Sequence, residues 1–358
     1  MDNIKPREQI EKIEAYSPGT PVEEVQRQLG LTKVVKLASN ENPFGYSPLA
    51  EQAMIEEVQK INMYPEVALP LLAGSLAEKL GVSREQLFFG NGSDEIIRLL
   101  TTTYINQSDE AVMADVTFPR YYTDVLIGGG TPITVPLVEG VHDLEGMLAA
   151  VRAKTKMVFV CNPNNPTGTV VGKEQLLHFI ERIPSHVLIV IDEAYYEYVH
   201  STDYLETVPL LDKYPNLIVL RTFSKIYGLA GLRVGYGLMN PELVQNLMRV
   251  KEPFNVNRMA QRAALASLND DKFVAMTRER NEQGKRIYER TFSELGLPYF
   301  SSQANFVMVD VKRPAKIVYM DLLKRGVIVR PVGYPTTIRV TIGNEEEVET
   351  FVQALKML

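Results

Sequence analysis

The sequence predicts an α/β protein with a mainly parallel sheet, followed by a smaller α+β domain. Short runs rich in Val, Ile and Leu alternate with amphipathic stretches from about residue 45 to residue 250. Such alternation is typical of a parallel sheet with helices on both faces. After Pro253 the alternation stops and a long helical pattern begins. We therefore expect a large domain over residues 46–250 and a small domain over residues 251–358.

Six apolar runs of the large domain have the length and β-branched content of buried strands. They lie at residues 111–114, 133–135, 157–160, 187–191, 217–220 and 234–238. Between the runs, amphipathic patterns predict helices over residues 49–60, 93–104 and 173–182. The small domain is expected to contain, in order, helical residues 259–295, a strand at 305–309, a helix at 316–325, strands at 327–330 and 337–342, and a helix at 345–356.

Composition excludes several classes of function. The chain has 358 residues, of which 45% are hydrophobic, and this is enough for a large buried core. Its net charge of −6 and the lack of a basic stripe argue against a nucleic-acid partner. The polar start and the absence of a long apolar run predict no signal peptide and no membrane partner. With a single cysteine, Cys161, we expect a cytoplasmic protein, and the spacing of the four histidines predicts no metal site.

The stretch from Thr222 to Lys225 carries the most specific chemical signal. It follows the apolar run 217–220, and Arg233 stands eight residues after the lysine in the sequence GLRVG. A lysine amine can bind an aldehyde covalently, while hydroxyls and a guanidinium bind a phosphate. Pyridoxal 5′-phosphate (PLP) carries both groups. Taken alone, the stretch fits a solvated loop lysine equally well.

Two other strand ends carry polar residues. Asp192 opens the sequence DEAY after the run 187–191, where open α/β sheets bind ligands. A carboxylate there can pair with a protonated pyridine nitrogen. The turn NPNNPTG (residues 162–168) follows the run 157–160 and can aim an amide at a ring oxygen. Each feature alone fits an ordinary strand end, but three in order favour a cofactor site.

A glycine-rich turn, GNGSDE at residues 90–95, precedes the helix expected at 93–104. Free N–H groups at the start of a helix bind anions well. The same residues also fit a plain helix cap. Together with Lys225 and Arg233, they favour a phosphate site.

The order NPNNPTG, DEAY, TFSK and GLRVG resembles the fold-type-I PLP-dependent aminotransferases. Further motifs are similar to those of the histidinol-phosphate aminotransferase family, and the resemblance covers essentially the whole chain. These motifs are LASNENP (37–43), NMYP (62–65), GNGSDE (90–95) and PFNVN (253–257). The family pattern also implies that residues 1–45 join the small domain.

The resemblance implies a role for each residue of the site. It assigns the phosphate to Gly92, Ser93, Asp94, Thr222, Ser224 and Arg233. It assigns the cofactor ring to Asp192 at the pyridine nitrogen, Asn165 and Tyr195 at the hydroxyl, and Phe118 on the ring face. Lys225, Asp192 and Tyr195 are the expected catalytic residues. Tyr64 is expected to reach the phosphate of a neighbouring subunit, which implies a homodimer with shared active sites.

For the substrate, the resemblance implies Arg339 as the residue that binds a carboxylate or phosphate. Arg330 is a second candidate for the substrate phosphate, although it also fits a surface arginine on a strand. Tyr16 is a candidate to close over the substrate. The implied reaction converts histidinol phosphate and 2-oxoglutarate to imidazole acetol phosphate and glutamate in histidine biosynthesis. An aromatic amino acid aminotransferase, a threonine-phosphate decarboxylase and a non-catalytic PLP-fold regulator remain as alternatives.

Overall fold

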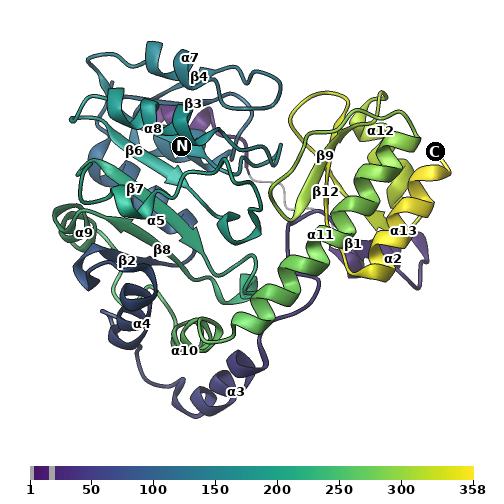
Figure 1. Cartoon of the computed structure of the whole chain (residues 1–358), viewed down its shortest axis with the longest axis horizontal. Coiled ribbons are helices and arrows are strands. Elements are labelled where there is room, and N and C mark those ends of the chain that lie inside the picture. The colour runs from purple at the N-terminus through teal and green to yellow at the C-terminus, as the bar shows by residue number, and fades with distance from the viewer. Residues whose placement is uncertain (1–3, 16–20) are drawn as a thin grey trace.

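The computed structural model describes residues 4–15 and 21–358. Its centre is a seven-stranded sheet of order β2-β8-β7-β6-β5-β3-β4 (Figure 1). The strands are β2 (Leu87–Gly90), β3 (Glu110–Ala114), β4 (Thr131–Val135), β5 (Thr155–Cys161), β6 (Leu188–Asp192), β7 (Leu217–Thr222) and β8 (Gly235–Met239). Only β8 runs antiparallel to its neighbours, β2 and β7, so the prediction of a mainly parallel sheet is confirmed.

The large domain contains the helices that the sequence predicts and further helices that it does not predict. α5 (Ser93–Tyr104) and α8 (Lys173–Arg182) begin and end where the sequence predicts, and α3 (Pro48–Glu57) continues into a 3₁₀ turn. The sequence pattern did not predict α4 (Pro70–Leu80), α6 (Arg120–Gly128), α7 (Leu144–Ala149) and α9 (Pro241–Met248). A proline at the first position starts both α4 and α9, because its missing N–H is not needed there.

A second, smaller core is built on three antiparallel strands of order β11-β12-β9. These are β9 (Phe306–Asp310), β11 (Arg330–Pro331) and β12 (Thr337–Thr341), packed with α12 (Ala315–Leu323) and α13 (Glu345–Lys356). Part of the N-terminal segment joins them, since β1 (Val35–Lys36) pairs in parallel with β10 (Val327–Ile328). α2 (Val22–Leu29) packs on the same side through Val25. The exact domain bounds stay predictions.

The prediction of a single long helical region at residues 259–295 is wrong in one respect. The structure divides it into α10 (Arg258–Ser267) and α11 (Asp271–Glu294). The break lies at Asp270, whose carboxylate accepts a hydrogen bond from the Phe273 N–H at 3.0 Å and one from the Ser47 hydroxyl at 2.6 Å. A capping carboxylate starts a new helix because it satisfies free N–H groups. The buried alanines of α10 pack in the large core, and α11 leads from there to the small one (Figure 1).

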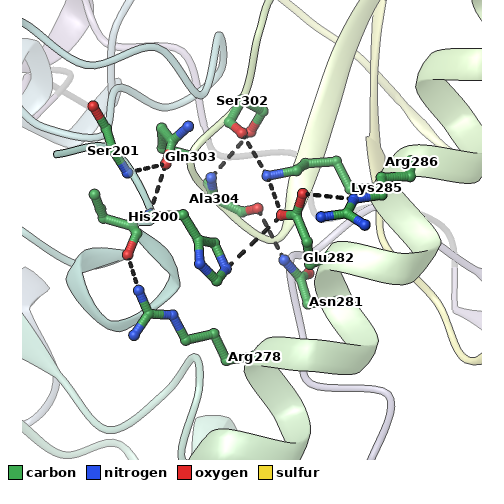
Figure 2. Close-up of polar contacts among 11 residues, drawn as sticks. His200, Ser201, Arg278, Asn281, Glu282, Lys285, Arg286, Ser302, Gln303 and Ala304 are labelled. Carbon is green, nitrogen blue, oxygen red and sulfur yellow. Dashed lines mark hydrogen bonds and ion pairs between the residues drawn. The ribbon is translucent and has the colours of Figure 1, made fainter. Parts of the chain in front are cut away.

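Polar contacts join α11 to loops on either side of it (Figure 2). Arg278 donates to the carbonyl of Val199, and the buried amine of Lys285 donates to the carbonyl of Ser302 at 2.9 Å. The side-chain amide oxygen of Gln303 accepts from the backbone N–H of His200 at 2.8 Å. The Gln303 N–H in turn donates to Gly168 at 2.7 Å, which ties the end of the NPNNPTG turn to the segment that enters β9.

In the part of the chain that the structure describes, each helix is too short or too polar to cross a membrane.

Candidate active site

A cavity of about 250 Å³ lies at the carboxyl ends of β5, β6 and β7, where parallel sheets bind ligands. The start of α5 forms one wall, and β11 and β12 of the small domain form the opposite wall. The structure brings most of the expected site residues together there. Those that line the cavity are Ser93, Asp94, Phe118, Asn165, Asp192, Tyr195, Thr222, Ser224, Lys225, Arg233, Arg330 and Arg339.

Gly92 shapes the cradle at the start of α5. Its φ of +77° lies in the left-handed region, and a Cβ there would come within 2.5 Å of Arg233 Nη2. Gly235 leaves similar room, because a Cβ on it would lie 2.5 Å from the Ser93 nitrogen. Within residues 4–15 and 21–358, no side-chain hydrogen bond caps the start of α5. The first N–H groups of α5 are therefore free to bind an anion.

Arg233 faces these N–H groups. Its guanidinium donates to the Ser224 hydroxyl at 3.3 Å and pairs with Asp94 at 3.4 Å. Its backbone is also left-handed, with φ +58°, an uncommon conformation for arginine that aims the side chain back toward α5. Thr222 Oγ1 accepts from the Ser224 N–H at 3.1 Å. Guanidinium, hydroxyls and N–H groups thus converge as a phosphate requires.

Asp192 is buried at the end of β6. Its Oδ1 accepts from the Ala194 N–H at 3.1 Å, and its Oδ2 accepts from the Tyr121 hydroxyl at 2.6 Å. Burial is the main cause that raises the pKa of this carboxyl to about 6. Hydrogen bonds from Tyr121 and Ala194 act in the opposite direction. At pH 7–8 the carboxylate therefore stays negative and can pair with a cation in the cavity.

Lys225 follows β7 and projects into the same cavity. Burial lowers the pKa of its amine to about 8, and the positive charge of Arg339 adds to this effect. Its Nζ lies 5.7 Å from the centre of the Tyr195 ring. An amine that is partly neutral near pH 8 can act both as a nucleophile and as a base.

Tyr195 is held by a residue to which the sequence reasoning gave no role. Its buried hydroxyl accepts a hydrogen bond from Asn40 Nδ2 at 2.9 Å. Burial raises the pKa of the phenol, so the hydroxyl keeps its proton and can donate into the cavity. Asn40 has φ +55°, and its own N–H donates to Thr341 of β12 at 3.0 Å. Asn40 belongs to the motif LASNENP, but the motif alone does not show that Asn40 contacts Tyr195.

Arg339 orients the side chain of Asn165. Its Nη1 donates to Asn165 Oδ1 at 2.6 Å, and its Nη2 donates to the carbonyl of Ala38 at 2.7 Å. Since the amide oxygen of Asn165 is engaged, its NH₂ group is left to donate toward the cavity. Arg330 lies directly opposite Arg339 in the strand register and also lines the cavity. Two arginines on one wall favour an anionic substrate.

Tyr121 is a further residue that the sequence analysis missed. It lies three residues after Phe118, and the two rings meet edge to face with centroids 5.5 Å apart. The Tyr121 N–H donates to the Phe118 carbonyl at 3.3 Å, in the turn that leads into α6. Its partner Asp192 is 71 residues away in sequence, so the hydrogen bond itself was not foreseeable.

Tyr64 does not join the other predicted site residues. Tyr64 is 77% exposed and stacks on Phe254 with ring centroids 4.5 Å apart, and it is not among the residues that line the cavity of its own chain. Tyr16 lies outside the described residues. Among residues 4–15 and 21–358, no three His, Cys, Asp or Glu side chains are placed to hold a metal ion.

Comparisons with known proteins agree with this geometry. The family model "Aminotransferase class I and II" matches residues 32–355. The solved structure of histidinol-phosphate aminotransferase from Sinorhizobium meliloti in complex with pyridoxal-5′-phosphate superposes with a TM-score of 0.92. The two chains are 28% identical, and the match covers 99% of this chain and 97% of that one. Fold and site therefore define a fold-type-I aminotransferase.

Relatives of higher identity narrow the class. Histidinol-phosphate aminotransferase from Brevibacillus brevis is 48% identical, over 99% of this chain and 98% of its own length. The one from Moorella thermoacetica is 50% identical, over 98% and 92%. The chain belongs to the histidinol-phosphate aminotransferases of the class I and II aminotransferase family, and the resemblance seen in the motifs is confirmed.

Proposed function

We propose that this chain is a PLP-dependent aminotransferase that interconverts histidinol phosphate plus 2-oxoglutarate and imidazole acetol phosphate plus glutamate, a step of histidine biosynthesis. One observation carries the proposal. Lys225, with its lowered pKa, lines the same cavity as an anion cradle at the start of α5 and the buried carboxylate of Asp192. An aldehyde, a phosphate and a pyridine nitrogen need these three partners.

The residues present fit the cofactor. The glycine-lined cradle with Ser93, Ser224 and Arg233 would hold its phosphate, because a larger side chain at Gly92 would collide with Arg233. Asp192 would meet its ring nitrogen. Asn165 and Tyr195 would donate to its hydroxyl oxygen, and Phe118 would cover one ring face. When bound, PLP supplies an electron sink that stabilises negative charge at the substrate carbon.

Lys225 has two tasks in this proposal. Its amine would hold the cofactor through the aldehyde carbon, with release of water. Once free again, the amine would take the proton from the substrate carbon and return it at the neighbouring position. Because burial lowers the pKa of this amine to about 8, a neutral fraction can accept the first proton, and the ammonium formed in that way can return it.

The two arginines of the small domain select the substrate. Arg339 is held by Ala38 and Asn165, so its guanidinium is fixed before a substrate arrives. Through two parallel N–H···O hydrogen bonds, this guanidinium can bind both oxygens of the glutamate carboxylate. Histidinol phosphate lacks a carboxylate but carries a phosphate, and Arg330 beside Arg339 adds charge for that group. One wall thus accommodates both substrates.

A single-turnover experiment tests the function. The purified PLP form is mixed with L-histidinol phosphate or with L-phenylalanine, and loss of the absorbance of the aldehyde form is followed. We expect histidinol phosphate to react at least about 10-fold faster, because two arginines bind its phosphate with charge-assisted hydrogen bonds. Equal or faster reaction with phenylalanine would identify a broad aromatic aminotransferase instead. No reaction with either, but carbon dioxide release from threonine phosphate, would identify a decarboxylase.

The proposal includes a homodimer. Large apolar side chains lie exposed along and after α3 and near Phe254, namely Ile55, Ile61, Met63, Tyr64 and Leu71. An exposed apolar surface of this kind marks a protein interface. Tyr64 lies on it, away from the cavity of its own chain, and this supports its role at the phosphate of a neighbouring subunit. The isologous contact of two identical chains brings each Tyr64 toward the other chain.

Mixing two inactive variants tests the shared site. A Lys225→Ala chain and a Tyr64→Ala chain are unfolded together, refolded and loaded with PLP. Each hybrid dimer then holds one site with both native residues, so we expect about a quarter of the native activity at equal mixing. Each variant alone, treated in the same way, is the control. Activity no higher than that of the better single variant would show that the site does not use Tyr64 from the neighbour.

A cytoplasmic location is also part of the proposal. It is supported by the chain's one cysteine, Cys161, which is buried and unpaired. A protein without disulfides suits a reducing compartment. Fractionation of the host cell, followed by assay of amino transfer, tests the location.

A further inference from the structure

The mechanism above gives no role to Tyr121, a buried titratable side chain that contacts Asp192. Tyr121 lies near the start of α6, behind the cavity, and its side chain is fully buried. Its ring stacks on Phe159 of β5 with centroids 4.7 Å apart and planes 10° apart, and it meets Phe118 edge to face. Its hydroxyl lies 2.6 Å from Asp192 Oδ2. A ring clamped on two sides holds that hydroxyl in one place.

In the hydrogen bond between these two residues, Tyr121 donates and Asp192 accepts. Burial raises the pKa of the Tyr121 phenol well above its usual value, so the tyrosine keeps its proton and donates. An O–H···O⁻ bond of this length is charge-assisted and stronger than a neutral one. The Ala194 N–H holds the other oxygen of Asp192 at 3.1 Å. With both oxygens engaged, the plane of the carboxylate is fixed.

We infer that Tyr121 is a positioning residue for amino transfer, which fixes the Asp192 carboxylate and its negative charge for the ring nitrogen of the cofactor. The inference rests on the proposed function. Tyr121 acts through Asp192, since its hydroxyl bonds to that carboxylate.

The charges around Asp192 explain why such a donor is needed. Burial and the nearby carboxylates of Asp94 and Glu193 all disfavour ionisation of Asp192, and its pKa of about 6 reflects them. Hydrogen bonds from the Tyr121 hydroxyl and the Ala194 N–H favour the ionised carboxylate and lower the pKa of Asp192. If the Tyr121 hydroxyl is removed, the pKa of Asp192 must rise further, because a hydrogen bond to the charged form is lost. Near pH 7, a fraction of the Asp192 carboxyl groups would then be protonated and neutral, and these could not pair with a protonated ring nitrogen.

Tyr121→Phe tests the inference, since it removes the hydroxyl and keeps the ring packing. Tyr122→Phe is the matched control: the same chemical change at the next residue, whose side chain is 46% exposed. PLP affinity of the apo chain is measured by equilibrium dialysis, and kcat and KM by amino transfer. For Tyr121→Phe we expect PLP to bind about 10-fold more weakly and kcat to fall about 10-fold or more, with KM nearly unchanged. Tyr122→Phe should match the native chain within about twofold.

A double-variant cycle distinguishes positioning from a general structural effect. In an Asp192→Asn background the carboxylate is absent, so Tyr121→Phe should change PLP affinity and kcat by less than about twofold. An equally large effect in both backgrounds would overturn the inference, and so would a Tyr121→Phe chain that matches Tyr122→Phe. If the native chain transfers amino groups, the proposed function stands whichever result the cycle gives for Tyr121. If the native chain binds no PLP, the proposed function fails first and the inference falls with it.

Discussion

Replacement of Lys225 with alanine is expected to lower the rate of amino transfer at least about 1,000-fold, because one amine serves as both nucleophile and proton carrier. Among the described residues that line the cavity, Lys225 is the only lysine, and burial has already lowered its pKa to about 8. Removal of the side chain leaves the phosphate cradle and Asp192 in place. PLP should therefore still bind, without a covalent bond. The rate is measured in single turnover with histidinol phosphate.

Two further measurements make this prediction specific. Borohydride reduction of the PLP-loaded native chain should fix the cofactor permanently to the peptide that contains Lys225, as read by mass spectrometry. The Lys225→Ala chain should show no such adduct. Lys213→Ala is the control, since that lysine is exposed and pairs with Glu181 at 3.3 Å. A Lys225→Ala chain that turns over near the native rate would contradict the proposed chemistry.

The sequence predicts the centre of this site well because its parts lie at strand ends. Parallel strands bring their carboxyl ends to one edge of a sheet, so Asp192 after β6 and Lys225 after β7 had to lie close together. The same reasoning placed the NPNNPTG turn after β5. Local chemistry and topology agree at these positions, and no long-range contact has to be guessed.

The residues that hold the site were harder to foresee. Asn40 reaches Tyr195 across 155 residues, and Arg339 reaches Asn165 across 174. Such pairs depend on how the small domain packs against the large one, and no local pattern encodes that packing. The break between α10 and α11 was missed for a similar reason, since the Asp270 cap is fixed by Ser47 from a distant loop. Strand β2 was missed because its four residues, LFFG, include no β-branched residue and run directly into the glycine-rich turn.

A buried ion pair behind the site is expected to matter most for stability. Glu193 Oε2 lies 2.9 Å from Arg221 Nε and 2.8 Å from Arg221 Nη2, and Thr207 donates to Glu193 Oε1 at 2.6 Å. Both charged side chains are almost fully buried. Glu193 directly follows Asp192, and Arg221 directly precedes Thr222. The pair therefore joins β6 to β7 where the two strands present the groups for the ring nitrogen and the phosphate.

Glu193→Gln should reduce the free energy of unfolding by about 3–5 kcal/mol, because it removes the carboxylate in direct contact with the buried guanidinium of Arg221. Urea unfolding of the whole chain measures this, and Glu206→Gln, a change at an exposed glutamate that accepts from Tyr196, should stay within about 0.5 kcal/mol of native. The combined change Glu193→Leu with Arg221→Met should recover most of the loss, since an apolar pair of similar size avoids the cost of desolvation. If the double variant is as unstable as Glu193→Gln, packing and not unpaired charge is the cause. If it is stable but binds PLP poorly, the ion pair is there to aim the neighbouring Asp192 and Thr222, and its cost in stability is what the site requires.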